Sequence, residues 1–175
     1  MYRDASQVEP AELAETDPGL DFREFFEGEY RRLAKALFLV TGDRLEAEEL
    51  AQEALVRVFE RCDHVRQMHS PTGYLYRTAL NLSRSRARRL ASRARHALSP
   101  SPEADLLAGV EARDEVRRLL ATLPRGQREA VVLVEWLGMG ADEAGPILGI
   151  DGSTVRVQLS RARRALRTAA APRDE

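Results

Sequence analysis

The clearest helical pattern in the chain is GIDGSTVRVQLSRARRALR, residues 149–167. Its apolar residues follow one another at steps of four, three and four: Val155, Leu159, Ala162 and Leu166. This spacing puts the four side chains on one face of a helix. No acidic residue lies between Gly152 and Arg173, so the opposite face is strongly basic. We therefore predict a helix that turns one stripe toward a core and an arginine-rich face outward.

A short helix and a turn precede this basic helix. Residues 141–150 have the pattern of a short helix that ends at Gly149, and residues 151–152 supply a tight turn. Ser153 or Thr154 can cap the basic helix through its hydroxyl. Two short helices joined by a turn, the second one basic, are typical of a helix-turn-helix. The charge pattern alone leaves one alternative open, an ordinary core helix with a solvated basic face.

The composition makes a single large enzyme core unlikely. A chain of 175 residues with 43% apolar and 6% aromatic content can form one domain or two small ones. The net charge of −1 conceals blocks of opposite sign: residues 1–19 carry a net −4, whereas residues 64–102 carry eight arginines and no acid. Basic blocks on an otherwise neutral chain indicate contact with a polyanion.

Cysteine content and hydropathy indicate where the protein acts. Cys62 is the single cysteine, which excludes an internal disulfide and suits a reducing compartment. No signal-peptide pattern or membrane-length apolar run is present, so we expect a cytoplasmic protein without membrane insertion. Cys62, His64 and His69 match no common zinc spacing, and we predict neither a metal nor a cofactor.

Two helices are predicted in the first part of the chain, after a polar, acidic tail at 1–19. Residues 21–40 place aromatic and aliphatic residues at helical spacing, which favours burial in a core. Asp43 and Glu46 resemble a capping box that opens a helix running to about Arg61. Its expected buried stripe is Ala47, Leu50, Ala51, Ala54, Leu55 and Val58. Its outer face is acidic, for which simple solvation is an equal alternative.

A third helix is predicted from Thr72, after an aperiodic stretch at 62–71. It is apolar and aromatic first and densely arginine-rich later, which suits nucleic acid better than a protein core. Tyr74 and Tyr76 are positioned to stack on bases. A Ser-Pro-rich linker follows at 97–110. A helix is then expected over 110–123. The next helix starts at Pro124 and includes 127–137, and the helix-turn-helix follows it.

Taken together, the segments resemble a bacterial RNA polymerase sigma factor of the extracytoplasmic-function group in the sigma-70 family. DRLEAEELAQEALVRVFER, residues 43–61, resembles the acidic core-binding helix of that group. YLYRTALN, residues 74–81, resembles its Trp-Leu-Tyr-Arg-Ile-Ala-x-Asn motif, with tyrosine in place of the tryptophan. Leu123-Pro124 and residues 149–166 resemble signatures of its second domain. The departures are Ser153 in place of glycine and Gly145-Pro146 inside the first short helix, where proline removes an amide donor.

The resemblance implies a non-catalytic subunit that gives promoter specificity to core polymerase. It implies an all-α protein of two small helical domains, 20–96 and 111–170, joined by a flexible linker at 97–110. The first domain would bind core polymerase through Glu46, Glu49, Gln52 and Glu53. It would hold the single strand of the −10 element through Tyr74, Tyr76, Arg77, Asn81, Arg84 and Arg88.

The second domain would bind the duplex −35 element. The residues that the resemblance assigns to this role are Ser153, Thr154, Arg156, Val157, Ser160, Arg161, Arg163 and Arg164. If the first short helix starts near Asp142, the strain from Pro146 falls in its first turn. The family also implies an anti-sigma factor as partner. A free-standing helix-turn-helix regulator is the alternative, and an enzyme is disfavoured because no catalytic constellation is present.

Overall fold

Helices make up the described part of the chain, residues 22–96 and 111–170 of a computed structural model, and no strand occurs within it. The first half, 22–96, holds α1 (Phe22–Thr41), α2 (Arg44–Phe59), α3 (Cys62–Arg66) and α4 (Pro71–His96). The second half, 111–170, holds α5 (Glu111–Ala121), α6 (Arg125–Val131), a π-helical turn η1 (Val132–Trp136), α7 (Ala141–Leu148) and α8 (Gly152–Ala170). The all-α prediction is confirmed. The predicted tail and linker lie outside the described residues.

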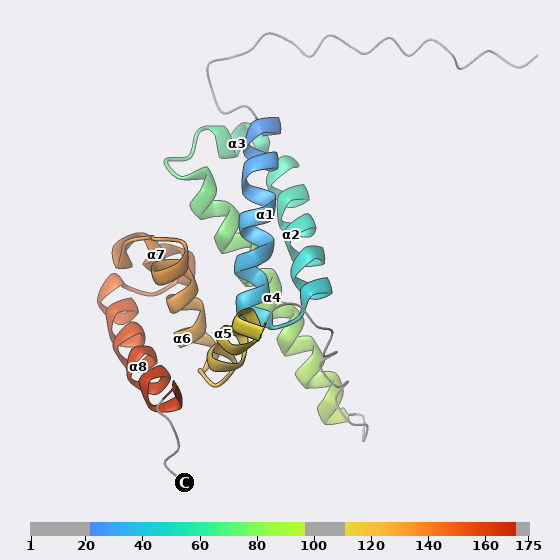
Figure 1. The fold of residues 1–175 in the computed structure, drawn as a ribbon. Coiled ribbons are helices and arrows are strands. Elements are labelled where there is room, and N and C mark those ends of the chain that lie inside the picture. The colour runs from blue at the N-terminus through green and yellow to red at the C-terminus, as the bar shows by residue number, and fades with distance from the viewer. Residues whose placement is uncertain (1–21, 97–110, 171–175) are drawn as a thin grey trace, which may run out of the picture.

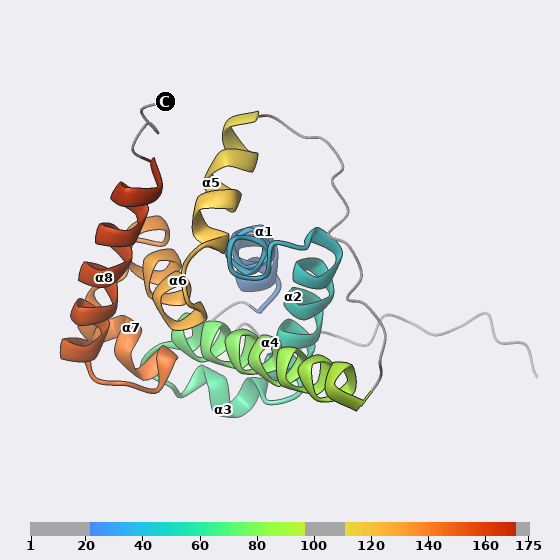
Figure 2. The ribbon, with the colours of Figure 1, turned by 90° about the horizontal axis from the view of Figure 1, so that it is seen from below.

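In the first half, α2 lies beside α1 and packs against α4 (Figures 1 and 2). All six predicted stripe residues of α2 are buried. Asp43 caps this helix, because its Oδ1 accepts a hydrogen bond from the Glu46 N–H at 2.9 Å. The N–H of Asp43 donates to Thr41 Oγ1 at 3.2 Å, so only one half of the predicted capping box is present. The side chains that set this interface were therefore correctly predicted from periodicity.

A short helix, α3, occupies part of the stretch predicted to be aperiodic. It spans five residues, and Val65 is its one buried residue. A single anchor cannot produce a repeat in the sequence, because a periodic pattern needs at least two turns. The sequence of 62–71 therefore has no period although it contains a short helix.

In the second half, α6 continues directly into the wider turn of η1. The N–H of Leu137 donates to the carbonyl of Val132, five residues back, at 3.0 Å. Val132 and Leu133 are buried within this turn, and Leu137 is buried directly after it. The sequence predicted one regular helix over 127–137, and no residue type in the stretch marks a π-helical turn.

The first helix of the helix-turn-helix, α7, accommodates a proline in its interior. The helix begins at Ala141, so Pro146 lies in its second turn rather than in the first turn as predicted. The missing amide removes one helical hydrogen bond. The helix ends as predicted at Gly149, whose φ of +74° is left-handed. The Ile150 N–H then donates to the Gly145 carbonyl at 3.0 Å, which closes the helix end.

Two glycines allow α7 and α8 to approach closely. A Cβ at Gly145 would lie 2.7 Å from the Ile150 carbonyl oxygen, and a Cβ at Gly152 would lie 3.1 Å from Asp142 Cα. Because α8 begins at Gly152, Ser153 and Thr154 lie in its first turn. The prediction that one of them caps the helix is therefore wrong.

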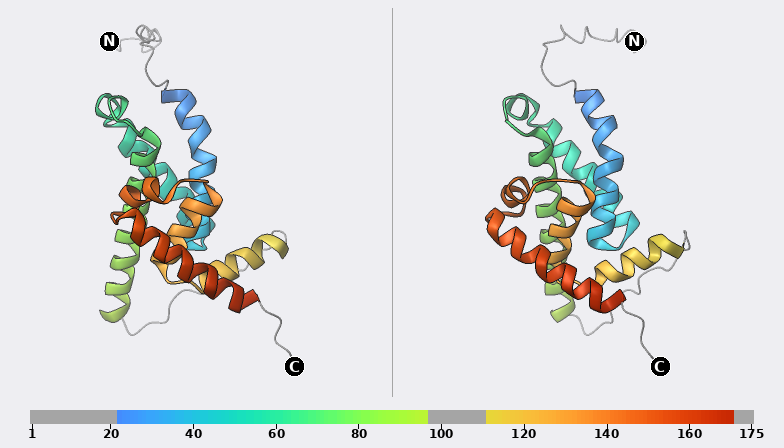
Figure 3. Two further views of the ribbon diagram at one scale, coloured as in Figure 1. Left: turned by 90° about the vertical axis from the view of Figure 1, so that its left-hand side faces the viewer. Right: turned by 60° about the vertical axis from the view of Figure 1, so that its left-hand side comes forward.

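The two halves pack against each other and share one hydrophobic core. α7 lies on α4, and α1 contacts α5, α6 and η1 (Figure 3). The main cluster of buried residues includes Leu37 and Leu75 from the first half together with Leu133 and Ile147 from the second. Within the described ranges, no helix is long and apolar enough to cross a membrane. The packing places α8 on the outside, where it makes no substantial contact with the first half.

Candidate DNA-binding and protein-binding surfaces

The outward face of α8 is exposed along its length. Val155, Leu159 and Ala162 are buried, so the helix is anchored by the stripe that was predicted. All eight residues proposed to read duplex DNA are exposed: Ser153, Thr154, Arg156, Val157, Ser160, Arg161, Arg163 and Arg164. Val157 is 47% exposed among these polar side chains. An apolar side chain at such a position is able to contact the methyl group of thymine.

Two arginines of α8 pair with acids of the same half. Arg156 Nη1 lies 3.2 Å from Asp142 Oδ1 on α7, and Arg163 contacts Glu135 of η1. Both pairs are at the surface, where an ion pair contributes about 0–1 kcal/mol. A phosphate can replace such a partner at little cost. The face therefore presents a basic surface whose cations are already held in position.

The acidic surface of α2 is partly neutralised by Arg86 of α4 and by Arg57 of α2 itself. Glu49 and Glu53 are 61% and 49% exposed in their side chains. Arg86 Nη2 of α4 lies 2.7 Å from Glu49 Oε2, and Arg57 Nη2 lies 2.7 Å from Glu53 Oε1. Burial raises the pKa of the Glu46 carboxyl, and the nearby charge of Arg86 offsets part of this effect. Gln52 is exposed on the same helix, so the four predicted core-binding residues form one continuous surface.

A groove of about 780 Å³ lies between α2 and α4. Arginines outnumber acids in its lining, which includes Arg57, Arg61, Arg77, Arg86, Arg89 and Arg93 together with Glu53 and Glu60. Tyr74 and Asn81 also line the groove, and the Tyr74 hydroxyl accepts a hydrogen bond from Arg61 Nη1 at 3.2 Å. A basic groove with an aromatic ring and an amide has the chemistry that single-stranded nucleic acid requires.

The residues predicted to hold a single strand divide into three groups. Tyr74, Arg77 and Asn81 come together in the groove, and Arg88 is exposed beside it on α4. Tyr76 is only 2% exposed, and its ring belongs to the core. Burial raises the pKa of the Tyr76 hydroxyl well above its usual range, and the Glu29 carboxylate adds to this effect. The prediction that Tyr76 stacks on bases is therefore wrong.

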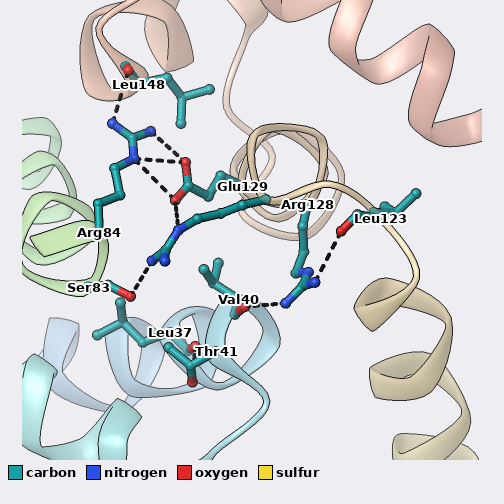
Figure 4. Close-up of polar contacts among 10 residues, drawn as sticks. Leu37, Val40, Thr41, Ser83, Arg84, Leu123, Arg128, Glu129 and Leu148 are labelled. Atoms are coloured by element: carbon teal, nitrogen blue, oxygen red, sulfur yellow. Dashed lines mark hydrogen bonds and ion pairs between the residues drawn. The ribbon is translucent and has the colours of Figure 1, made fainter. Parts of the chain in front are cut away.

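Arg84, the remaining member of that set, contacts the second half instead of facing the groove. Its Nη2 lies 2.5 Å from Glu129 Oε2, and its Nη1 donates to the Leu148 carbonyl at 3.2 Å (Figure 4). Sequence reasoning missed Glu129, and it also missed Arg57 and Arg61 as groove residues. The Arg125 to Glu129 spacing of four residues was the one available signal, since it pairs charges on a helix.

The geometry defines a class of protein. A helix-turn-helix with an exposed basic second helix is joined to a helical unit that carries an arginine-lined groove. The chain is thus an all-helical protein with the architecture of a helix-turn-helix DNA-binding protein.

Comparison with known families identifies the class further. Residues 25–93 match the family described as Sigma-70 region 2, and residues 113–166 match Sigma-70, region 4. The ECF RNA polymerase sigma factor SigC of Mycobacterium tuberculosis is 31% identical over 133 residues, which cover 73% of this chain and 72% of that protein. The RNA polymerase sigma-E factor of Streptomyces coelicolor is 29% identical over 157 residues, with 89% of each chain covered. The chain belongs to the extracytoplasmic-function group of the sigma-70 family.

Solved structures share the same fold. The sigma factor RpoE of Bartonella quintana, in complex with the anti-sigma factor NepR, matches with a TM-score of 0.72 at 21% identity. The match covers 85% of this chain and 95% of that one. CnrH, in complex with the cytosolic domain of CnrY, matches with a TM-score of 0.61 at 23% identity over 85% and 86% of the two chains. The family is one of non-catalytic transcription initiation factors, and this chain is a sigma factor that directs transcription initiation.

Proposed function

We propose that residues 20–96 form the sigma region 2 domain and bind core RNA polymerase through the acidic surface of α2. Glu49, Gln52 and Glu53 are exposed there, and Glu46 extends the surface toward α4. The exposed surface pairs with Arg86 and Arg57 are worth little, so a basic or amide-rich partner can displace them. Charge complementarity of this kind speeds association and selects the partner.

The groove between α2 and α4 holds the single strand of the −10 element in this proposal. Tyr74 supplies a ring for stacking, and Asn81 supplies an amide able to bond the edge of an extruded base. Arg77 and Arg88 bind phosphates along the strand. Extrusion of a base costs a few kcal/mol, which stacking and new hydrogen bonds offset, so melting needs no ATP.

Residues 111–170 form the sigma region 4 domain, and α8 enters the major groove of the −35 element. The observation that carries this assignment is the exposure of one continuous face of α8 above a buried apolar stripe. Arg156, Val157, Ser160 and Arg161 lie where side chains reach base edges. Arg163 and Arg164 bind phosphates, which fix position without reading sequence.

The remaining proposals concern partners and setting. Residues 97–110 serve as the linker and residues 1–19 as an acidic tail. An anti-sigma factor regulates the chain, as the complexes of RpoE with NepR and of CnrH with CnrY suggest by likeness. The chain catalyses no reaction of its own and works in the cytoplasm with the polymerase.

Transcription from a promoter library by purified core polymerase plus this chain tests the function. We expect transcripts from a subset of promoters that share one −10 and one −35 sequence. Omission of the chain is the control and should abolish them. Selective duplex binding by the chain alone, with no transcription and no association with core polymerase, would instead identify a free-standing regulator.

A further inference from the structure

An acidic side chain of α7 lies against the first turns of α8. The two helices pack against each other in the helix-turn-helix (Figure 1). Asp142, the second residue of α7, places both carboxylate oxygens near one nitrogen of Arg156. Its Oδ1 lies 3.2 Å and its Oδ2 3.3 Å from Arg156 Nη1. The acid and the cation thus come from different helices of the motif, 14 positions apart in the sequence.

The start of α8 leaves room for this carboxylate. The helix begins at Gly152, and a Cβ built there would overlap Asp142 Oδ1. Any other residue at 152 would therefore displace the carboxylate. Arg156 follows Gly152 by four residues, so the two lie on the same face of the helix, one turn apart. The Asp142 carboxylate thus lies along the first turn of α8, between the backbone of Gly152 and the guanidinium of Arg156.

The pair affects the orientation of Arg156 more than the stability of the fold. The Asp142 and Arg156 side chains are 80% and 59% exposed, and an ion pair at such a surface adds little to folding. A long side chain loses rotamer freedom when it binds, and this cost falls when a neighbouring group already holds it in the bound orientation. The consequence of the pair is therefore to be sought in what Arg156 binds.

The contact with Asp142 leaves one edge of the Arg156 guanidinium available. The pair uses Nη1, whereas Nε and Nη2 form the other edge of the planar group. Two parallel N–H groups of this kind match the O6 and N7 acceptors of guanine in the major groove. Arg156 is the fifth residue of α8, and the N-terminal residues of a recognition helix are those that contact base edges. Arg156 is thus placed to read a guanine while Asp142 holds Nη1.

We propose that Asp142 is a positioning residue for promoter recognition, which holds Arg156 in the orientation that reads a guanine of the −35 element. The inference rests on the proposed function, in which Arg156 reaches a base edge. Arg163 and Glu135 form the contrasting pair, because Arg163 is assigned to phosphates, which carry no sequence information. Without Asp142 the chain distinguishes bases less well, whereas without Glu135 it binds every sequence more tightly.

Promoter discrimination by purified core polymerase with the full chain tests the proposal. Arg156→Ala first locates the −35 base pair that this arginine reads, as the position at which discrimination falls. Asp142→Ala should lower discrimination about threefold to tenfold at that same base pair, the range expected when one side chain has to be ordered on binding. Asp142→Asn keeps an oxygen able to accept from Nη1, so it should recover part of the loss. In the double variant, Asp142→Ala should add nothing to Arg156→Ala, because the acid acts through the arginine.

Glu135→Ala is the matched control, since it also removes an exposed acid that pairs with an arginine of α8. It should tighten binding about equally on all −35 sequences. The same uniform gain in Asp142→Ala, or a loss of discrimination by Asp142→Ala that remains in the Arg156→Ala background, would overturn the proposal. Circular dichroism checks that each variant is folded. If Asp142→Ala is not, Asp142→Asn decides the question through a smaller loss at the same base pair.

Nitrogen-15 relaxation of the arginine Nε groups in the free chain measures the positioning without DNA. The Arg156 signal, assigned by its absence from Arg156→Ala, should be ordered in the wild type and mobile in Asp142→Ala. Arg161, exposed on the same helix, is the reference, and its mobility should not change. An Arg156 signal that is equally mobile in both proteins would refute the positioning.

The two assays also separate failure of the inference from failure of the proposed function. If Arg156→Ala leaves discrimination unchanged at every −35 base pair, the role proposed for Arg156 fails, and the inference fails with it. If Arg156→Ala loses discrimination while Asp142→Ala keeps it, the proposed function stands and only the positioning by Asp142 is wrong.

Discussion

The arginine-rich helices α4 and α8 differ in what their arginines contact. On α8, Arg156 and Arg163 pair at the surface with acids of their own half. On α4, Arg86 reaches Glu49 of α2, and Arg84 reaches the buried Glu129 of the other half. The two sequences are similarly basic, yet α8 offers its cations outward while α4 also uses them to join elements. Exposure and partner, more than the number of arginines, decide what is available to DNA.

The same contrast separates two tyrosines of α4. Tyr74 lines the groove, whereas Tyr76, two residues later, is buried in the core. We expect Tyr76→Ala to lower the free energy of unfolding by about 3–5 kcal/mol, as for other buried aromatic residues. Tyr74→Ala should change stability little and weaken binding of a −10 single strand by about 1–3 kcal/mol. Urea unfolding, and anisotropy of a labelled strand with core polymerase present, measure the two effects. Equal loss of stability in both variants would contradict the division.

Charge reversal on α2 tests whether the exposed acids of this helix bind core polymerase. Glu49→Arg with Glu53→Arg should weaken core-polymerase binding by about a hundredfold or more, because reversed charges at an interface cost several kcal/mol. Both side chains are exposed, so the fold should persist. The control is Glu27→Arg with Glu115→Arg, which changes net charge equally at exposed sites on α1 and α5. Normal association of the α2 variant in a pull-down would exclude this surface.

Apolar periodicity predicted the buried stripes of single helices. It missed the burial of side chains that depends on contacts with helices far away in the sequence. The buried stripes of α2 and α8 follow from apolar spacing, since local geometry alone fixes which side of a helix they share. Tyr76 was misassigned because its neighbours Leu75, Ala79 and Leu80 are all buried, which makes the covered arc of α4 wider than one stripe. A wide arc arises when helices from two sides pack on one helix. A single sequence contains no record of that second contact.

Glu129 is the sharpest example of the same limit. An acid next to Ala130 and Val131 has the appearance of an ordinary surface residue in sequence. Its burial depends on Arg84, 45 positions earlier, and on the docking of α7 against α4. The exposure of the residues proposed to read the −35 element was easier to predict, because the buried stripe of α8 alone orients them. The groove residues Arg57 and Arg61 were missed because only the acids drew attention in the helix predicted to run to about Arg61.

Two arginines of α8 allow a direct comparison of an arginine paired with an acid and an arginine offered to DNA, since both are exposed and only two positions apart. Arg163 is held by Glu135, whereas Arg161 lies with Val157 on the face proposed to reach base edges. Arg161→Ala should cost about 1–3 kcal/mol in discrimination between promoters that differ in the −35 element. Arg163→Ala should weaken binding about equally on every sequence and reduce the slope of log affinity against log salt by about 1.

Run-off transcription and salt-dependent binding, measured on matched promoters, distinguish these two signatures. If Arg163→Ala lost affinity for some −35 sequences more than for others and Arg161→Ala did not, α8 would be rotated in the DNA major groove relative to the proposed assignment. Because the buried stripe fixes how α8 is turned on its own domain, such a rotation would have to come from the way the whole second half docks on the duplex.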